Sequence, residues 1–127
     1  AHHPTEINAV EHSVREMYPN EKVLAVFQPH LYSRTKDFIN DFAVALSKFD
    51  EVLLLDIYPA RELPITGVTS SWLLNKLTIN NKKLVVKDKL GEEVLKSDAK
   101  IITMLGAGDI GLLVDEVKSK LEKKYAN

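Results

Sequence analysis

Short, continuous apolar runs alternate in this chain with segments whose apolar residues recur every three or four positions. A run that is apolar at every position is typical of a parallel strand covered on both faces. The runs occupy residues 23–27, 52–55, 84–86 and 101–105. Strands that alternate with helices are joined by right-handed crossovers. The alternation therefore predicts an α/β fold with a mostly parallel sheet and helices on both faces.

Helical spacing defines the segments that flank these strands. Ile7, Val10, Val14 and Met17 recur at that spacing and predict one apolar face on the first helix. The expected helices lie around residues 4–17, 38–49, 72–77, 92–96 and 110–121. Helices that connect parallel strands in this way leave the carboxyl ends of all the strands at one edge of the sheet.

Length and composition restrict the possible functions. The 127 residues suffice for one domain with a single hydrophobic core. The formal net charge of -1 argues against a nucleic acid as main partner, because binders of the phosphate backbone carry a clustered basic excess. No run is long enough for a membrane span, no signal peptide is visible, and cysteine is absent, which fits a cytoplasmic protein. Because the chain starts at Ala1, directly before the first expected helix, we expect it to be excised from a longer protein.

The loop of residues 28–35 is the strongest candidate site. It follows the first apolar strand and opens a helix, so its side chains and the free N–H groups of that helix meet at the carboxyl edge of the sheet. It contains His30, Tyr32 and Arg34, which packing alone does not require. The alternative is an ordinary loop in which Ser33 or Thr35 caps the helix.

Two other polar segments are weaker candidates. Residues 56–62 follow the second strand, where Arg61 taken alone is better explained as a solvated charge. His2 and His3 precede the first helix and are interpreted as capping residues or as remnants of a tag. Without a third ligand at suitable spacing they make a poor metal site, so no metal is expected in this domain.

A glycine-rich turn follows the last strand. Gly106, Gly108 and Gly111 have the spacing of a dinucleotide-binding fingerprint. That fingerprint also needs a further strand with an acidic residue about 20 positions on, to hold the ribose. Only sixteen residues follow Gly111, and they are expected to form a helix and a tail. The turn therefore favours close packing of helix and strand over NAD binding, although an anion could rest on the helix N-terminus.

Several segments together resemble one family. They are Ala1-His2-His3-Pro4-Thr5-Glu6, Gln28-Pro29-His30-Leu31-Tyr32-Ser33-Arg34-Thr35, Tyr58-Pro59-Ala60-Arg61-Glu62 and Gly106-Ala107-Gly108-Asp109-Ile110. In this order and spacing they resemble the C-terminal domain of the Mur ligases, and within that family the members that add L-alanine. Each motif alone is weak, but four in order are specific. The resemblance covers residues 1–127 and implies a single, Rossmann-like domain.

The resemblance implies a cytoplasmic, three-domain enzyme of bacterial peptidoglycan synthesis. Its substrates would be ATP, L-alanine and UDP-N-acetylmuramate, whose lactoyl carboxylate is phosphorylated to an acyl phosphate that the alanine amine attacks. Magnesium would neutralise the phosphates, and positioned positive charge would stabilise the transition state. The domains that bind ATP and the UDP-sugar would precede this chain. The isolated domain is therefore predicted to be inactive and to bind neither ATP nor magnesium tightly.

The same resemblance identifies candidate substrate-binding residues. His2 and Arg34 match positions that face the alanine and the reacting carboxylate, and His3, His30 and Tyr32 lie beside them. A guanidinium suits a substrate carboxylate because its planar fork donates two parallel hydrogen bonds and stays charged. No residue of this domain is expected to be catalytic.

One position of this chain departs from the family, and this leaves open how the substrate carboxylate is bound. Many family members have Arg where this chain has Leu31, so either Arg34 acts alone or Arg61 helps it. Alternatively, Arg34 pairs locally with Asp37 and has a structural role. A second class of function is a free-standing α/β module that uses the glycine turn to bind a nucleotide or another anion.

Overall fold

The computed structural model describes residues 3–106 of the chain. Its elements are α1 (Pro4–Met17), β1 (Val23–Gln28), α2 (Tyr32–Asp37), α3 (Ile39–Leu46), β2 (Glu51–Leu54), α4 (Ser70–Lys76), β3 (Lys82–Leu84), the 3-10 helix η1 (Lys87–Lys89), α5 (Leu90–Lys96) and β4 (Ile101–Gly106). Within this part of the chain no helix has both the length and the apolar content that a membrane crossing needs. The expected helix around residues 110–121 lies outside the described residues.

The four strands form one parallel sheet with the order β3-β2-β1-β4. Ala25 in the centre of β1 pairs with Val52 of β2 on one side and with Thr103 of β4 on the other. The chain adds β2 and β3 on one side of β1 and then returns to place β4 on the opposite side. The order of the strands therefore reverses between β1 and β4, and open α/β sheets bind ligands at such a reversal, outside the carboxyl ends of the strands.

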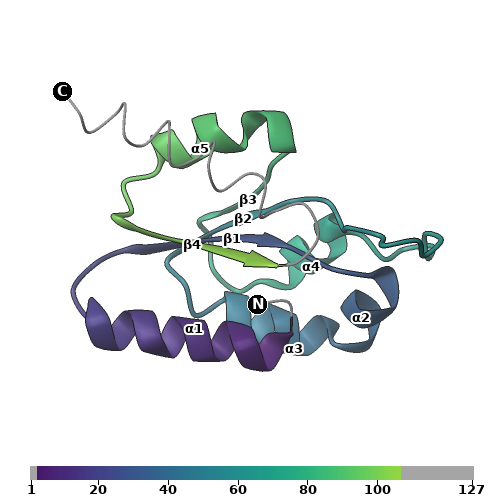
Figure 1. Cartoon of the computed structure of the whole chain (residues 1–127), viewed down its shortest axis with the longest axis horizontal. Helices are drawn as coiled ribbons and strands as arrows, with labels where there is room; N and C mark the ends of the chain where they lie inside the picture. The colour runs from purple at the N-terminus through teal and green to yellow at the C-terminus, as the bar shows by residue number, and fades with distance from the viewer. Residues whose placement is uncertain (1–2, 107–127) are drawn as a thin grey trace.

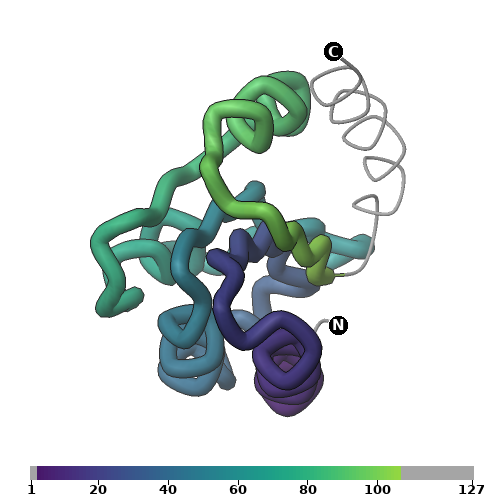
Figure 2. The backbone as a smooth tube through the Cα atoms, turned by 90° about the vertical axis from the view of Figure 1, so that its left-hand side faces the viewer, coloured from purple at the N-terminus to yellow at the C-terminus, as the bar shows by residue number. Residues whose placement is uncertain are grey.

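Both faces of the sheet are covered, as the apolar runs predict. All six residues of β1 are buried, and their side chains alternate between two cores. Val23, Ala25 and Phe27 join a cluster with residues of α1, α3 and α4, whereas Leu24 and Val26 join one with residues of α5. Figure 1 shows α5 on one side of the sheet and α1 and α3 on the other, and the end-on view in Figure 2 separates the two layers. The predicted α/β fold is confirmed.

The helix expected around residues 38–49 is preceded by a separate short helix. Phe38 lies between α2 and α3 and leaves the helical conformation, with φ -115° and ψ 23°. Its ring packs edge-on against the ring of His3, with 5.0 Å between the centroids. Phe42 and Leu46 are fully buried, as the helical spacing predicts.

Two details of the prediction are wrong. Met17, assigned to the apolar face of the first helix, is 65% exposed at the last position of α1. The third strand was expected at residues 84–86, but β3 comprises Lys82–Leu84, and Val86 is exposed. Because β3 is an edge strand with only one neighbour, lysines are tolerated in it. The apolar run marks instead the segment after β3, where Val85 is buried against the α5 face.

Candidate functional site

Two loops meet at the carboxyl ends of β1 and β2. The backbone N–H of Leu31 donates to the Tyr58 carbonyl at 2.9 Å, and the N–H of Tyr58 donates to the Pro29 carbonyl at 2.8 Å. These bonds form an isolated parallel bridge between His30 and Tyr58. The pairing of β1 with β2 thus continues past the strand ends and fixes the loop of residues 28–35 beside the loop of residues 56–62.

Arg34 is held by a histidine within the first loop. Arg34 Nη1 lies 3.1 Å from His30 Nδ1. A guanidinium can only donate, so His30 Nδ1 accepts and the ring proton of a neutral His30 belongs on Nε2. The His30 ring also stacks on Tyr58, with 5.8 Å between centroids and 14° between the planes. This contact uses one of the five N–H groups of Arg34, and a carboxylate needs only two.

Glu62 joins the second loop to the first turn of α2. The backbone N–H of Ser33 donates to Glu62 Oε1 at 3.1 Å, and the Ser33 hydroxyl donates to Glu62 Oε2. The Ser33 hydroxyl and N–H hold the pKa of the Glu62 carboxyl below its usual range. Glu62 therefore carries its negative charge at neutral pH.

The alternative interpretation, in which Ser33 or Thr35 caps this helix, is wrong. Leu31 occupies the N-cap position and offers no side-chain hydrogen bond, and both hydroxyl residues lie inside α2. The Thr35 hydroxyl donates to the Leu31 carbonyl at 2.8 Å instead. Reasoning from local sequence missed Glu62, because a cap supplied 29 positions away has no signature in the spacing of neighbouring residues.

Three residues other than glycine in these loops have a left-handed backbone. They are Leu31 with φ 72°, Ala60 with φ 47° and Arg61 with φ 76°. Such a conformation costs of order 1 kcal/mol or more per residue and persists only where surrounding contacts enforce it. At Leu31 the backbone bond to Tyr58 supplies one such contact. Strained residues of this kind cluster at binding sites.

Two hollows open at this edge of the sheet. One of about 280 Å³ is lined by Tyr32, Asp56, Ile57, Pro59, Val68, Thr69 and Ser70. Another of about 310 Å³ is lined by Gln28, Leu55, Asp56, Val85, Val86, Lys87 and Asp88. Their volumes lie close to the lower limit of the range for small-molecule sites. Tyr32 thus faces a hollow beside the loop that carries Arg34.

The structure explains why the first residue of the glycine-rich turn, Gly106, must be a glycine. Gly106 pairs with Gln28 at the ends of β4 and β1, and its φ is 133°. A Cβ atom there would lie 2.6 Å from the Gln28 carbonyl oxygen. Only glycine allows this close approach. Gly108 and Gly111 lie outside the described residues.

The amino-terminal histidines are not joined to Arg34 by the described contacts. His3 caps α1, because its Nδ1 accepts the Thr5 N–H at 3.3 Å, and its ring packs on Phe38. The expected capping role is therefore confirmed for His3. His2 lies outside the described residues. Arg34 contacts His30, and not Asp37, in the described part of the chain.

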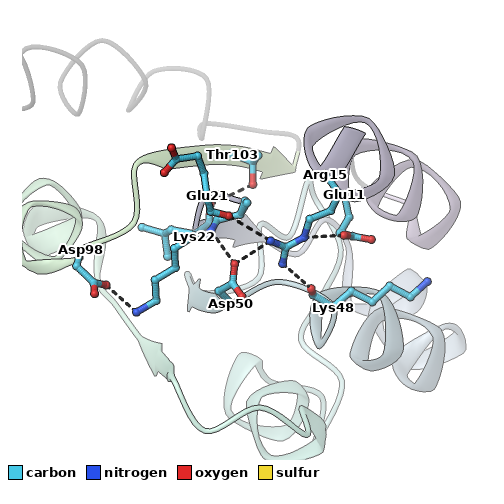
Figure 3. Close-up of polar contacts among 10 residues, drawn as sticks. Glu11, Arg15, Glu21, Lys22, Lys48, Asp50, Asp98 and Thr103 are labelled. Atoms are coloured by element: carbon cyan, nitrogen blue, oxygen red, sulfur yellow. Dashed lines mark hydrogen bonds and ion pairs between the residues drawn. The ribbon is translucent and has the colours of Figure 1, made fainter. Parts of the chain in front are cut away.

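The opposite edge of the sheet also carries charged residues, but there they join elements to one another. Asp50 Oδ2 accepts hydrogen bonds from Arg15 of α1 at 2.9 Å and from the N–H of Val23 in β1 at 2.8 Å (Figure 3). Lys22 pairs with Asp98 at 2.7 Å across the start of the sheet. These charges stabilise the fold. The strained loops and the contact between Arg34 and His30 distinguish the carboxyl edge as the candidate site.

Comparisons with known proteins give the same family as the motifs. Residues 1–114 match the family described as "Mur ligase, glutamate ligase domain". A UDP-N-acetylmuramate–L-alanine ligase of Flavobacterium psychrophilum is 67% identical over 124 residues, which are 98% of this chain and 28% of that protein. A protein of the same name from Flavobacterium johnsoniae is 62% identical, over 97% of this chain and 27% of its own length. The chain thus spans little more than a quarter of these relatives.

A solved structure shows the same fold. The crystal structure of a UDP-N-acetylmuramate–alanine ligase from Thermotoga maritima matches with a TM-score of 0.76. It is 24% identical to this chain, and the match covers 98% of this chain and 26% of that one. The sheet and its crossovers are therefore those of a recurring fold. The chain belongs to the Mur ligase family, as a C-terminal domain of such a ligase.

Proposed function

We propose that this chain is the substrate-closing domain of an ATP-dependent, cytoplasmic ligase that joins L-alanine to UDP-N-acetylmuramate for peptidoglycan synthesis. The identity of 67% over almost the whole chain to a ligase of that name supports this proposal. The observation that carries it is the Arg34 guanidinium, held against His30 at the carboxyl edge of the sheet. That edge is where α/β sheets bind their ligands.

In this proposal Arg34 binds the carboxylate of the incoming L-alanine. The amine nitrogen then attacks the carbonyl carbon of the acyl phosphate, the C–N bond forms, inorganic phosphate leaves with the electrons of the broken C–O bond, and the amine loses a proton. Arg34 takes no part in bond making. Its contribution is to orient the amine, and orientation of two bound reactants accelerates reactions strongly.

The neighbouring residues have supporting roles. His30 and Tyr58 restrict Arg34 through one hydrogen bond and one ring stack. Tyr32 contributes a wall of the 280 Å³ hollow. His2 and His3 are assigned to the substrate side by resemblance to the family. Because Leu31 stands where many relatives have Arg, the exposed Arg61 is the cation available for a second contact.

ATP and magnesium are assigned to the rest of the parent protein. The described residues contain no group of three His, Cys, Asp or Glu side chains that could hold a metal ion. This domain would approach the nucleotide and the UDP-sugar only when it closes over them. The proposal therefore gives residues 3–106 the task of binding and orienting the amino acid.

Kinetics of Arg34 variants in the full-length ligase test this function. Arg34→Ala is expected to raise the KM for alanine about tenfold to more than a hundredfold and to leave the KM for ATP nearly unchanged, because a hydrogen bond to a charged group contributes about 1.5–3 kcal/mol. Arg34→Lys keeps the charge but not the fork and should recover only part of the loss. Lys36→Ala removes an exposed cation from the same helix and is the matched control.

A different result for Arg34→Ala would contradict a role of Arg34 in binding alanine. An unchanged alanine KM for Arg34→Ala, together with a lower melting temperature, would assign Arg34 to structure alone. The contact with His30 would then serve only to hold α2 in place.

A further inference from the structure

Glu62 binds the neighbouring loop through both of its carboxylate oxygens. Oε1 accepts the backbone N–H of Ser33 and Oε2 accepts the Ser33 hydroxyl. Glu62 lies on the loop after β2, and Ser33 lies in the first turn of α2. The two loops are thus joined by side chains as well as by the backbone bonds at Tyr58.

The first turn of α2 needs such a partner. The opening N–H groups of a helix have no acceptor within the helix, and a cap residue normally supplies one. Leu31, in the cap position, has no side chain that can accept a hydrogen bond. Glu62 accepts in its place, and its negative charge suits the positive end of the helix.

The environment of Glu62 keeps it in the accepting form. Hydrogen bonds from the Ser33 hydroxyl and the Ser33 N–H lower the pKa of Glu62. At neutral pH the carboxylate therefore accepts hydrogen bonds from Ser33 and donates none.

Glu62 contacts Ser33, the residue directly before Arg34, so a change at Glu62 can alter the position of Arg34. Arg34 directly follows Ser33, and α2 has only six residues, which is too short to hold its own conformation. We propose that Glu62 is a positioning residue, which caps α2 from the neighbouring loop and so fixes Arg34 for its substrate carboxylate. This inference rests on the proposed function, in which that carboxylate belongs to L-alanine.

The main core does not depend on this contact. Glu62 lies on an edge loop, and both apolar clusters are built from the sheet and from α1, α3, α4 and α5. A loss of the cap should therefore displace the loop while the domain remains folded. A displaced loop in a folded domain would distinguish a positioning role of Glu62 from a general contribution to the stability of the domain.

Kinetics of the full-length ligase test the effect on the substrate. Glu62→Ala should raise the KM for alanine about three- to tenfold, the size expected from loss of a helix cap, with the KM for ATP unchanged. Glu62→Gln retains one oxygen for the Ser33 N–H and an amide that can donate to the Ser33 hydroxyl, so it should restore most of the affinity. Asp98→Ala removes an acid that pairs across the opposite edge of the sheet and should leave the alanine KM unchanged.

A second measurement does not depend on alanine. Hydrogen exchange of the amides of residues 32–35 should speed up in Glu62→Ala but not in Asp98→Ala. If exchange is unchanged, the cap is refuted; if exchange speeds up and the alanine KM stays at the wild-type value, the positioning role is refuted. Should Glu62→Ala fail to fold, Ser33→Ala removes one of the two hydrogen bonds and tests the same contact.

These outcomes are separate from those for the proposed function. Arg34→Ala tests whether Arg34 binds alanine at all, and the exchange measurement tests the cap whatever the substrate is. Faster exchange in Glu62→Ala, combined with an unchanged alanine KM in Arg34→Ala, would refute the binding of alanine by Arg34 while the cap itself stood.

Discussion

Gly106 shows how a single residue allows two strands to approach each other closely. It ends β4 beside Gln28 of β1, with φ 133°, and a Cβ would lie 2.6 Å from the Gln28 carbonyl oxygen. That oxygen belongs to a paired backbone and cannot move as the end of a flexible side chain could. The first glycine of the turn is therefore required by packing, whatever the turn binds.

We predict that Gly106→Ala destabilises the domain by about 2–4 kcal/mol, from backbone strain together with overpacking. Gly67→Ala is the matched control, because Gly67 has φ 83° but nothing within 4 Å of its added Cβ. It should cost only the backbone term, roughly 1–2 kcal/mol. Chemical denaturation of the three proteins gives both values, and equal losses for the two variants would contradict the steric argument.

At the scale of single residues, contacts between residues close in the sequence could be predicted better than contacts between distant ones. His30, Tyr32 and Arg34 lie close together in the sequence just after β1, so their common location at the strand end could be predicted from their spacing. Glu62 could not be found in this way, because its contact with Ser33 joins two loops. The alternative in which Ser33 or Thr35 caps the helix is wrong, and Ser33 instead donates to a distant carboxylate.

At the scale of elements, Asp50 joins a helix to the central strand. It follows α3 and accepts hydrogen bonds from Arg15 of α1 and from the Val23 N–H at the start of β1 (Figure 3). Burial raises the pKa of Asp50, but the Val23 N–H and the Arg15 guanidinium outweigh it and hold the pKa below its usual range. The folded protein therefore binds this proton less tightly than the unfolded chain does.

This difference predicts a pH-dependent stability. Asp50→Asn should lower the free energy of unfolding at pH 7 by about 1–2 kcal/mol, the lower end for a hydrogen bond to a charged group because the pair is partly exposed. The stabilisation is complete above the unfolded pKa, near pH 4, and is lost as the pH falls through the lowered folded value. Urea denaturation from pH 7 to pH 3 should show the gap between wild type and variant closing at the acidic end.

The exposed Asp37 provides the control, and Asp37→Asn should change stability by less than about 0.5 kcal/mol at pH 7. A gap between wild type and Asp50→Asn that stayed constant down to pH 3 would show that the charge of Asp50 contributes nothing.

The errors in predicting elements have a common origin. Periodicity reports which side chains are apolar, but the end of a helix or strand depends on what packs against it. Phe38 continues the helical spacing of the next segment, yet its ring packs against His3 and it lies between two helices. Leu84 ends β3, although the apolar run extends two residues further.

At the scale of the whole molecule the fold could be predicted because every position of β1 is buried. Its side chains supply both cores, and a strand with no solvated face is typical of a parallel sheet with helices on each side. The carboxyl edge then follows from topology. Which loop residues meet there could not be predicted, because the bridge between His30 and Tyr58 depends on how the two loops extend the pairing of β1 and β2.

The 127-residue chain should fold without the rest of a ligase but should be inactive. Purified residues 1–127 should fold, because both apolar clusters are built from described residues, but should show no phosphate release that depends on ATP and alanine. The chain spans 28% of a similar ligase, and orientation of an amine accelerates amide formation only when the acyl phosphate is held beside it. Circular dichroism would check folding and a phosphate assay the activity, with the full-length ligase as positive control. Release above background from the 127-residue chain would show that the described edge holds more of the active site than the amino-acid site proposed for Arg34.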